Sequence, residues 1–314
     1  MRILVLGAGA VGGYFGGRMA EAGLDVTFLV RPARAELLAK NGLRIQSKAG
    51  DLKLKPQCVT AAQLRPGFDV VLFTAKAYDL GSAMDAVAPA MGPGTLVWPL
   101  LNGMSHLDAL DARFGRARVL GGVAYISSTL SPEGEIRHFS DFQRIVFGAR
   151  DVGGNAAQNA ACDALAAALA PVKFDWKKLD DVAQAMWDKW VMLASLAGMT
   201  CLMRAPVGDI VASAAGEKLM LAMLGECASV AKAEGFATPE AVLQNYRGML
   251  TLKGSLISAS MLRDVESGGQ AEGDHILGAL LARAQKAGVA TPLLEVAATH
   301  LEAYAARRKR EKAS

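Results

Sequence analysis

The stretch RILVLGAGAVGGYFGGRMAEAG, residues 2–23, decides the fold. It begins with an apolar run typical of a strand and continues as a helical segment over residues 10–22. Between the two, Gly7, Gly9 and Gly12 form the pattern G-x-G-x-x-G, and a plain glycine-rich turn does not explain all three positions. Glycine there permits a tight turn, close approach of the backbone to a pyrophosphate, and close packing of helix on strand, so the pattern predicts a dinucleotide site. The residues expected to bind the cofactor are Gly7, Gly9, Ala10, Val11 and Gly12.

Short apolar strands and helical segments continue to alternate through the first half of the chain. DVTFLV, FDVVLFTAK and TLVWPLLNG are typical of strands, and RAELLAKNG is typical of a helix closed by a glycine. This β-α-β order predicts an α/β fold with a doubly wound parallel sheet of the Rossmann type. Between residues 116 and 148, β-branched residues around the turn SPEG predict antiparallel strands, and PVKFDW follows as a last short strand.

The second half of the chain has a different pattern. Almost everything after Lys177 has helical periodicity, interrupted by prolines and glycines that mark helix ends. We therefore expect a Rossmann domain over residues 1–177 and an all-helical C-terminal domain over residues 178–314.

Composition narrows the class of protein. A chain of 314 residues with 52% hydrophobic and 20% charged residues is typical of a soluble globular protein with two domains. The net charge of +4 is spread along the chain without a basic stripe, so we expect no nucleic-acid partner. The uncharged run from Trp190 to Met203 is shorter than the ~20 residues that a bilayer requires, so we expect no membrane partner. Isolated cysteines, and histidines without ligand spacing, predict a reduced cytoplasmic protein without a metal.

The residues after the second strand indicate which dinucleotide is bound. An NAD site usually has an acidic residue there to hold the ribose 2′-hydroxyl, whereas this chain has Arg31 and Arg34. Guanidinium groups suit a 2′-phosphate because they donate charge-assisted hydrogen bonds in pairs. We therefore predict NADP(H) as the cofactor; the alternative is that these arginines only solvate a loop.

Two further loops follow predicted strands. Lys76 stands just past one strand end, and Asn102 with Gly103 stands past another. Because strand carboxyl ends line the ligand crevice of such sheets, these side chains could contact cofactor phosphate, ribose or substrate. It is equally open that these residues only form turns, since Asn-Gly is a common turn sequence.

Two segments of the helical half combine charge with apolar surroundings. MWDKWVMLASLAGMT, residues 186–200, places Lys189 between two tryptophans, and SASMLRDVESGGQAEGDHI, residues 258–276, gathers acidic residues around a glycine pair. Taken alone, Lys189 fits a lysine whose stem covers apolar surface while its ammonium reaches water. A buried ammonium would instead be a candidate for proton transfer.

The motifs together carry a resemblance over nearly the whole chain. In order, they are GAGAVG, RPAR, AK at 75–76, LNGM at 101–104, WDKW at 187–190, APVGDI at 205–210 and SML-D at 260–264. Their presence and order resemble the ketopantoate reductase (2-dehydropantoate 2-reductase) family. The resemblance implies a helical second domain like that of 6-phosphogluconate dehydrogenase, with the active site in the cleft between domains. It also implies NADPH-dependent reduction of a 2-keto acid, which serves pantothenate biosynthesis in the true reductases.

The resemblance also implies roles for single residues. The family's general acid falls on Lys189, and its acidic residue of the substrate cleft falls on Glu272, which we expect to act in catalysis. Substrate contacts fall on Asn102 and Ser260. The cofactor contacts fall on Arg31, Lys76, Asn102 and Glu272.

The chain departs from the family pattern at the substrate site. Leu193, Ala197 and Val207 stand where the family usually has asparagines, and AEGD replaces the usual TEID around Glu272. Because an amide in a substrate site discriminates strongly between polar and apolar ligands, these replacements predict a more apolar pocket.

Three hypotheses for the function stay open. They are reduction of 2-dehydropantoate, reduction of a more apolar 2-oxo acid, and non-catalytic NADP(H) binding by a redox sensor. All three take a small-molecule ligand. An apolar helix such as EKLMLAMLGECASVAKAEG could bury its face internally or in a homodimer.

Overall fold

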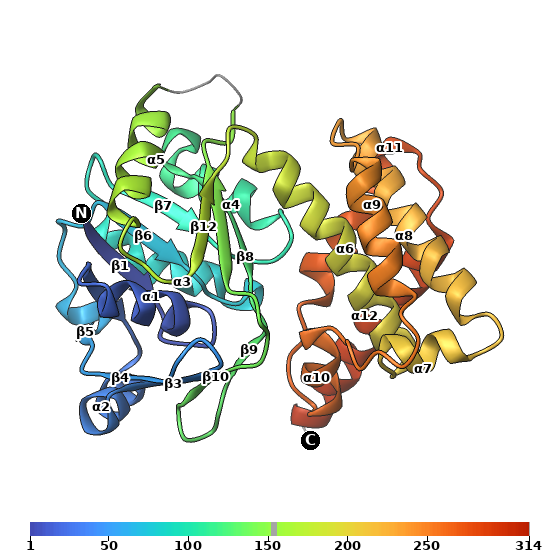
Figure 1. Cartoon of the computed structure of the whole chain (residues 1–314), viewed down its shortest axis with the longest axis horizontal. Helices are drawn as coiled ribbons and strands as arrows, with labels where there is room; N and C mark the ends of the chain where they lie inside the picture. Colours follow the sequence, from blue (N-terminus) through green and yellow to red (C-terminus); the bar gives the residue numbers. More distant parts are fainter. Residues whose placement is uncertain (152–155, 314) are drawn as a thin grey trace. The chain divides into compact units, whose positions relative to one another are not determined.

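The computed structural model describes residues 1–151 and 156–313 (Figure 1). It contains two compact units. The first comprises Met1–Leu101 and His106–Ala183, and the second comprises Asn102–Ser105 and Gln184–Ser314. The short loop Asn102–Ser105 thus groups with the second unit, although it follows a strand of the first. The domain boundary after residue 177 stays a prediction.

A five-stranded parallel sheet forms the centre of the first unit, in the order β5-β2-β1-β6-β7. Its strands are β1 (Arg2–Leu6), β2 (Asp25–Leu29), β5 (Gln57–Val59), β6 (Val70–Phe73) and β7 (Leu96–Pro99). Apolar runs such as RILVL form strands because both faces of a parallel sheet are covered. The α/β prediction is confirmed, and the chain reverses its direction of travel across the sheet at β1, the usual place for a ligand.

Two smaller sheets complete the first unit, in the orders β4-β3-β10-β9 and β12-β11-β8. Their strands are β3 (Leu43–Ser47), β4 (Leu52–Leu54), β8 (Gly121–Tyr125), β9 (Ser128–Leu130), β10 (Ile136–His138), β11 (Arg144–Gly148) and β12 (Asp175–Lys178). The predicted antiparallel strands are present, since β9 pairs antiparallel with β10 and β8 with β11.

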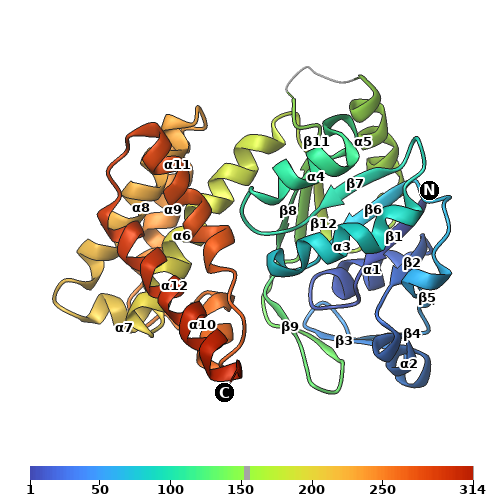
Figure 2. The same ribbon diagram turned by 180° about the vertical axis from the view of Figure 1, so that it is seen from behind.

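Helices flank these sheets. They are α1 (Gly12–Glu21), α2 (Pro32–Asn41), α3 (Leu80–Val87), α4 (His106–Phe114) and α5 (Ala156–Ala168), with single turns at Ala61–Gln63, Ala77–Asp79, Ala88–Ala90 and Arg116–Arg118. Helices α3 and α4 lie side by side (Figure 2), and α5 packs against β11 and β12. Phe28, Trp98 and Phe147 are fully buried in the core.

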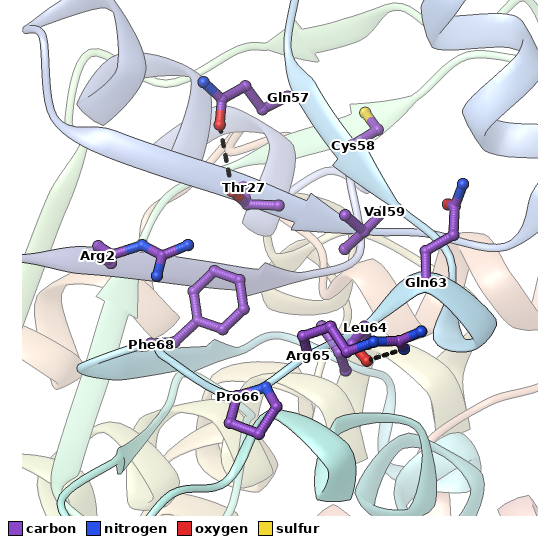
Figure 3. Close-up of a pocket in the computed structure, with 10 residues that line it drawn as sticks. All are labelled: Arg2, Thr27, Gln57, Cys58, Val59, Gln63, Leu64, Arg65, Pro66 and Phe68. Atoms are coloured by element: carbon purple, nitrogen blue, oxygen red, sulfur yellow. Dashed lines mark hydrogen bonds between the residues drawn. The ribbon is translucent and has the colours of Figure 1, made fainter.

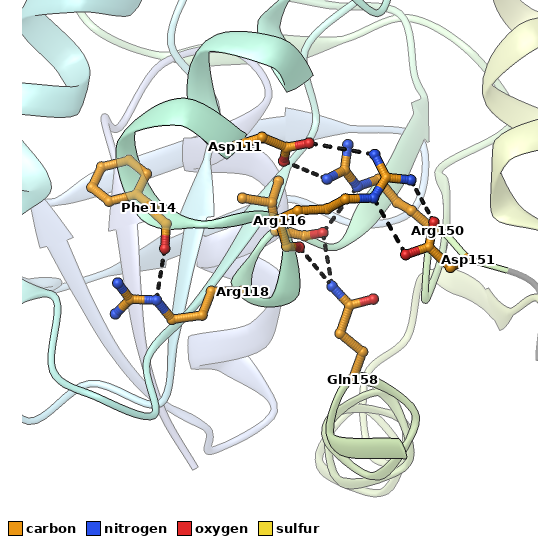
Figure 4. A network of polar contacts seen from close by, with 8 residues as sticks. Asp111, Phe114, Arg116, Arg118, Arg150, Asp151 and Gln158 are labelled. Carbon is orange, nitrogen blue, oxygen red and sulfur yellow. Dashed lines mark hydrogen bonds and ion pairs between the residues drawn. The ribbon is translucent and has the colours of Figure 1, made fainter. Parts of the chain in front are cut away.

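A network of ion pairs and hydrogen bonds connects α4 and α5 to the turn Arg116–Arg118 and to residues 150–151 after β11 (Figure 4). Arg150 pairs with Asp111, and Arg116 pairs with Asp151. Gln158 of α5 donates to the carbonyls of Arg116 and Val119, at 2.9 and 3.2 Å. The guanidinium groups and the Gln158 amide nitrogen find partners within this network, which indicates a structural role.

Every regular element in the described part of the second unit is helical. The helices are α6 (Val182–Met203), α7 (Val207–Ala212), α8 (Gly216–Ala233), α9 (Glu240–Leu250), α10 (Ser260–Glu266), the π-helix η5 (Asp274–Gly278), α11 (Ala279–Ala287) and α12 (Pro292–Ala313). A side chain at Gly198 of α6 would lie 3.0 Å from Leu277 and 3.2 Å from Met223, so this glycine lets three elements pack closely. Among the residues described, we find no helix with the length and apolarity that crossing a membrane requires.

Candidate active site

The loop between β1 and α1 has the geometry that its glycines predict. Gly7 adopts a φ of +88°, which favours glycine, and its amide donates to the Leu29 carbonyl at 2.9 Å. A Cβ on Gly12 would lie 2.3 Å from Thr74 Oγ1 and 2.6 Å from the Gly7 carbonyl oxygen, so α1 must begin here without a side chain. A Cβ on Gly9 would meet nothing within 4 Å, so the backbone at Gly9 faces open space. Ala10 and Val11 lie in the same turn, and the binding of a dinucleotide pyrophosphate by this loop stays a prediction.

Arg34 holds this loop from the side. Its Nη2 donates to the Ala8 carbonyl at 2.8 Å and to the Gly134 carbonyl at 3.1 Å. Burial lowers the pKa of Arg34. Its two carbonyl contacts hold the guanidinium against the loop. Sequence reasoning offered Arg34 only as a phosphate ligand or a solvated residue. Its contact with residue 134 has no local signal in the sequence.

Arg31 and Lys76 follow β2 and β6, the two strands on either side of β1. Arg31 precedes α2 with a side chain that is 80% exposed, and its Nη2 lies 3.2 Å from Asp79 Oδ2. Lys76 is exposed. Arg31 is therefore accessible to an anionic ligand, although a carboxylate competes for it.

Lys189 and Asn102 come together in the second unit. Lys189 Nζ on α6 donates to Asn102 Oδ1 at 3.0 Å, across 87 residues of sequence. Asn102 is followed by Gly103, whose φ of +72° lets the loop turn sharply after β7. The two residues that the Asn-Gly and Trp-Asp-Lys motifs singled out therefore share one site.

Glu272 adds a carboxylate to this site. Desolvation lowers the pKa of Lys189 from 10.5 to about 8, while the nearby charge of Glu272 acts in the opposite direction. Glu272 itself is buried, with 8% of its surface exposed. The glycine in AEGD has a packing reason, since a Cβ on Gly273 would lie 2.8 Å from Leu301 Cβ of α12.

The two tryptophans beside the lysine belong to the helical core. Trp187 and Trp190 are buried, with their ring centres 5.0 Å apart. Trp187 stacks on Phe236, and the Arg283 guanidinium lies over both indoles at 5.4 and 5.8 Å. This packing fixes the rotation of α6 about its axis and hence the direction in which Lys189 points.

The structure places the three positions at which the resemblance led us to expect asparagines. Ala197 and Val207 are fully buried, whereas Leu193, one turn after Lys189, keeps some exposure. Ser260 is exposed at the first residue of α10. The substrate role of Ser260 stays a prediction.

Sequence reasoning missed two residues of the second unit. Ser105 Oγ and His275 Nδ1 lie 2.8 Å apart, and His275 is also hydrogen-bonded to the backbone of Asn102. A histidine in GDHI and a serine in NGMSH carry no motif of their own. Only the fold brings them together.

A pocket of about 440 Å³ lies elsewhere in the first unit (Figure 3). Its lining residues are Arg2, Thr27, Gln57, Cys58, Val59, Gln63, Leu64, Arg65, Pro66 and Phe68. None of the residues predicted to bind cofactor or substrate is among them.

Comparison with known families gives two matches. The family model described as ketopantoate reductase PanE/ApbA matches residues 3–151, and the model of its C-terminal part matches residues 181–305. An uncharacterized oxidoreductase, YkpB of Bacillus subtilis, is 39% identical over 307 residues, covering 98% of this chain and 99% of its own. A 2-dehydropantoate 2-reductase of Mesorhizobium japonicum is 26% identical, covering 94% and 95% of the two chains.

Solved structures of ketopantoate reductases are similar to nearly the whole chain. A PanE/ApbA family ketopantoate reductase from Ralstonia eutropha has a TM-score of 0.87 at 27% identity, covering 98% of this chain and 100% of its own. A 2-dehydropantoate 2-reductase from Geobacter metallireducens has a TM-score of 0.85 at 31% identity, covering 96% and 99%. A D-mandelate dehydrogenase in complex with NADH and anilino(oxo)acetate shares the fold, with a TM-score of 0.86 at 21% identity over 98% and 99% of the two chains.

Proposed function

Because the chain belongs to the ketopantoate reductase family, we propose that it reduces a 2-oxo acid to the 2-hydroxy acid with NADPH. In this proposal Lys189 is the proton donor. The single observation that carries it is the hydrogen bond from Lys189 Nζ to Asn102 Oδ1 at 3.0 Å, on a lysine whose pKa is lowered to about 8.

The loop from Gly7 to Gly12 would hold the cofactor, which supplies the hydride when it is bound. Open space at Gly9 and the tight helix start at Gly12 support this assignment. Arg31 would hold the 2′-phosphate, for which its exposed guanidinium is suited, and Lys76 would add a second cation.

Lys189 would act on the carbonyl oxygen of the substrate. When hydride reaches the carbonyl carbon, negative charge develops on that oxygen, and an ammonium within hydrogen-bond reach stabilises it and donates the proton. With a pKa of about 8, the ammonium is mostly charged at neutral pH and still gives up its proton readily. Asn102 Oδ1 accepts from the ammonium and so orients it, while Glu272 favours its charged form.

The identity of the oxo acid is the second part of the proposal. 2-Dehydropantoate is the candidate that the family suggests, and its reduction would place the protein in pantothenate biosynthesis. Leu193, one turn from Lys189, and the buried Ala197 favour an oxo acid with a more apolar side chain. A hydrophobic side chain cannot hydrogen-bond a substrate hydroxyl, so a polar substrate loses affinity there.

Steady-state oxidation of NADPH with 2-dehydropantoate and a panel of aliphatic and aromatic 2-oxo acids tests the proposal. We expect turnover with at least one of them, and a higher kcat/KM for apolar side chains. Measurable NADPH binding without turnover on any 2-oxo acid would contradict the reductase and favour a non-catalytic cofactor-binding protein.

Cofactor choice is tested separately by titration with NADPH and NADH. We expect tighter binding of NADPH, and a smaller difference in Arg31→Ala. Equal Kd values for the two cofactors in the unmutated protein would contradict the assignment of Arg31.

A further inference from the structure

We propose that His275 is a positioning residue that fixes the loop Asn102–Ser105 and, through Asn102, the ammonium of Lys189. The inference rests on the proposed function, because it names a residue that positions the proton donor of that same site. His275 is the second residue of the π-helix η5, three residues after Glu272.

Two hydrogen bonds connect His275 to the loop. Its Nδ1 lies 2.8 Å from Ser105 Oγ, and its side chain is bonded to the backbone of Asn102. The loop is thus held at both of its ends by one imidazole. Asn102, the residue that receives the Lys189 ammonium, is one of these two ends.

Gly103 lies against the same histidine. A Cβ at this position would lie 3.1 Å from the His275 carbonyl oxygen and 3.2 Å from its ring Cδ2. Together with its φ of +72°, this close approach gives the glycine of the Asn-Gly pair a packing role as well as a turn role. The loop and the π-helix are therefore fitted to each other over consecutive residues.

The protonation state of His275 follows from its partners. We assign Nε2–H as the donor to the Asn102 carbonyl, since Nδ1 is taken by Ser105, whose hydroxyl can donate to it. Burial lowers the pKa of His275, while Glu272 and the bond to Asn102 oppose this shift. A neutral imidazole at neutral pH satisfies both partners without placing a second cation beside Lys189.

The π-helix also holds α6, so the contacts close a ring. Trp190, the neighbour of Lys189, donates from Nε1 to the Ile276 carbonyl at 2.9 Å. The Ile276 amide donates to the Glu272 carbonyl at 3.0 Å. Lys189, Asn102 and Glu272 are thus all held in place by contacts with the same π-helical turn. His275 provides the contact with Asn102. Single-turn π-helices of this kind are frequent at functional sites.

The inference is tested with His275→Leu and His275→Gln in the full chain. Leucine removes both hydrogen bonds, whereas the glutamine amide can replace Nε2–H. We expect His275→Leu to lower kcat about 10- to 100-fold, because small misplacements of a reacting group cost that much. KM and the Kd for NADPH should change far less, and His275→Gln should recover most of the lost kcat. Asp274→Asn, an exposed neighbour on the same turn, is the matched control and should leave kcat unchanged.

Equal losses of kcat in the leucine and glutamine variants would overturn the inference, and so would an unchanged kcat in His275→Leu. Should His275→Leu fail to fold, Ser105→Ala removes one of the two bonds and must lower kcat with an unchanged Kd for NADPH.

Amide hydrogen exchange separates this inference from the proposed function, since it needs no substrate. In His275→Leu, the amides of residues 102–105 should exchange faster, while those of α12 stay unchanged. Unaltered exchange in the loop would overturn the positioning role, whereas faster exchange in a protein without reductase activity would overturn the proposed function alone.

Discussion

A lysine ammonium that is partly removed from water beside a carboxylate experiences two opposed effects. At Lys189, desolvation outweighs the charge of Glu272, and the pKa falls to about 8. The native state therefore holds this proton less tightly than the unfolded chain does. The charged lysine costs stability below pH 8, and the cost is relieved as pH rises from about 8 toward the ordinary lysine value. Such a cost suggests a functional reason for the lysine.

The pH dependence of kcat tests this electrostatic balance. The proton donor must be protonated for reduction, so kcat should fall as pH rises through an apparent pKa of about 8. Because Glu272 raises the pKa of Lys189, Glu272→Gln should move this alkaline limb to lower pH. A limb that stays in place, or moves to higher pH, would show that Glu272 does not act on the lysine.

Sequence reasoning singled out Lys189 and Asn102 by their motifs, but not Ser105 and His275, which contact the same loop. Motifs identify residues that act by their chemistry, and Lys189 carries such chemistry. Ser105 and His275 meet across 170 residues of sequence, and that contact exists only in the folded chain.

At the scale of elements, the cofactor site is predicted at the glycine loop and the strands on either side of it. β1, β6 and β7 were predicted because they are continuous apolar runs buried in a parallel sheet, and β2 because its residues after Asp25 are apolar or β-branched. β3, β4 and β5 were missed. β4 and β5 have three residues each, LKL and QCV, too few to show a pattern, and β3 is a short run, LRIQS, with polar residues between its apolar ones.

Two glycine substitutions separate folding from cofactor binding. Gly9→Ala should fold with a stability within ~0.5 kcal/mol of the parent, because its Cβ meets no neighbour. It should nevertheless lose NADPH binding, because the methyl group occupies the space of the pyrophosphate. Gly12→Ala should lose NADPH binding and also about 1–3 kcal/mol of folding stability, because its Cβ collides with Thr74 and Gly7.

Chemical denaturation and NADPH titration check these variants. Gly81→Ala is the matched control, since its Cβ within α3 meets nothing within 4 Å. Undiminished NADPH binding by Gly9→Ala would place the pyrophosphate elsewhere.

Substitution of the two arginines after β2 should change cofactor binding in different ways. Arg34→Ala should raise the Kd of NADPH and of NADH by similar factors, because Arg34 holds the loop that both cofactors use. Arg31→Ala should raise the Kd of NADPH alone. Isothermal titration of both variants with both cofactors measures this. A selective loss of NADPH in Arg34→Ala would instead make Arg34 a ligand of the 2′-phosphate.

At the scale of the whole molecule, the chain is an oxidoreductase of the ketopantoate reductase family with two compact units. Motif order was enough to predict the family and the two-part fold. The substrate could not be predicted, because Leu193, Ala197 and Val207 stand where the resemblance led us to expect asparagines.

Cofactor binding should stabilise the first unit. At an NADPH concentration of ~100 times Kd, linkage predicts about 2.7 kcal/mol of added stability. Differential scanning calorimetry should therefore show an upward shift of one transition on adding NADPH. Lys189→Ala should keep the shift and Gly9→Ala should lose it. A shift that survives in Gly9→Ala would contradict binding at the glycine loop.

Single-turnover hydride transfer in Lys189→Ala is the most direct test of the central claim. NADPH-loaded enzyme is mixed with a saturating concentration of the best 2-oxo acid, and loss of reduced cofactor is followed. We expect the rate to fall about 10²- to 10⁴-fold, as for loss of a general acid, with the Kd for NADPH nearly unchanged. A rate within about twofold of the unmutated enzyme would remove Lys189 from the mechanism.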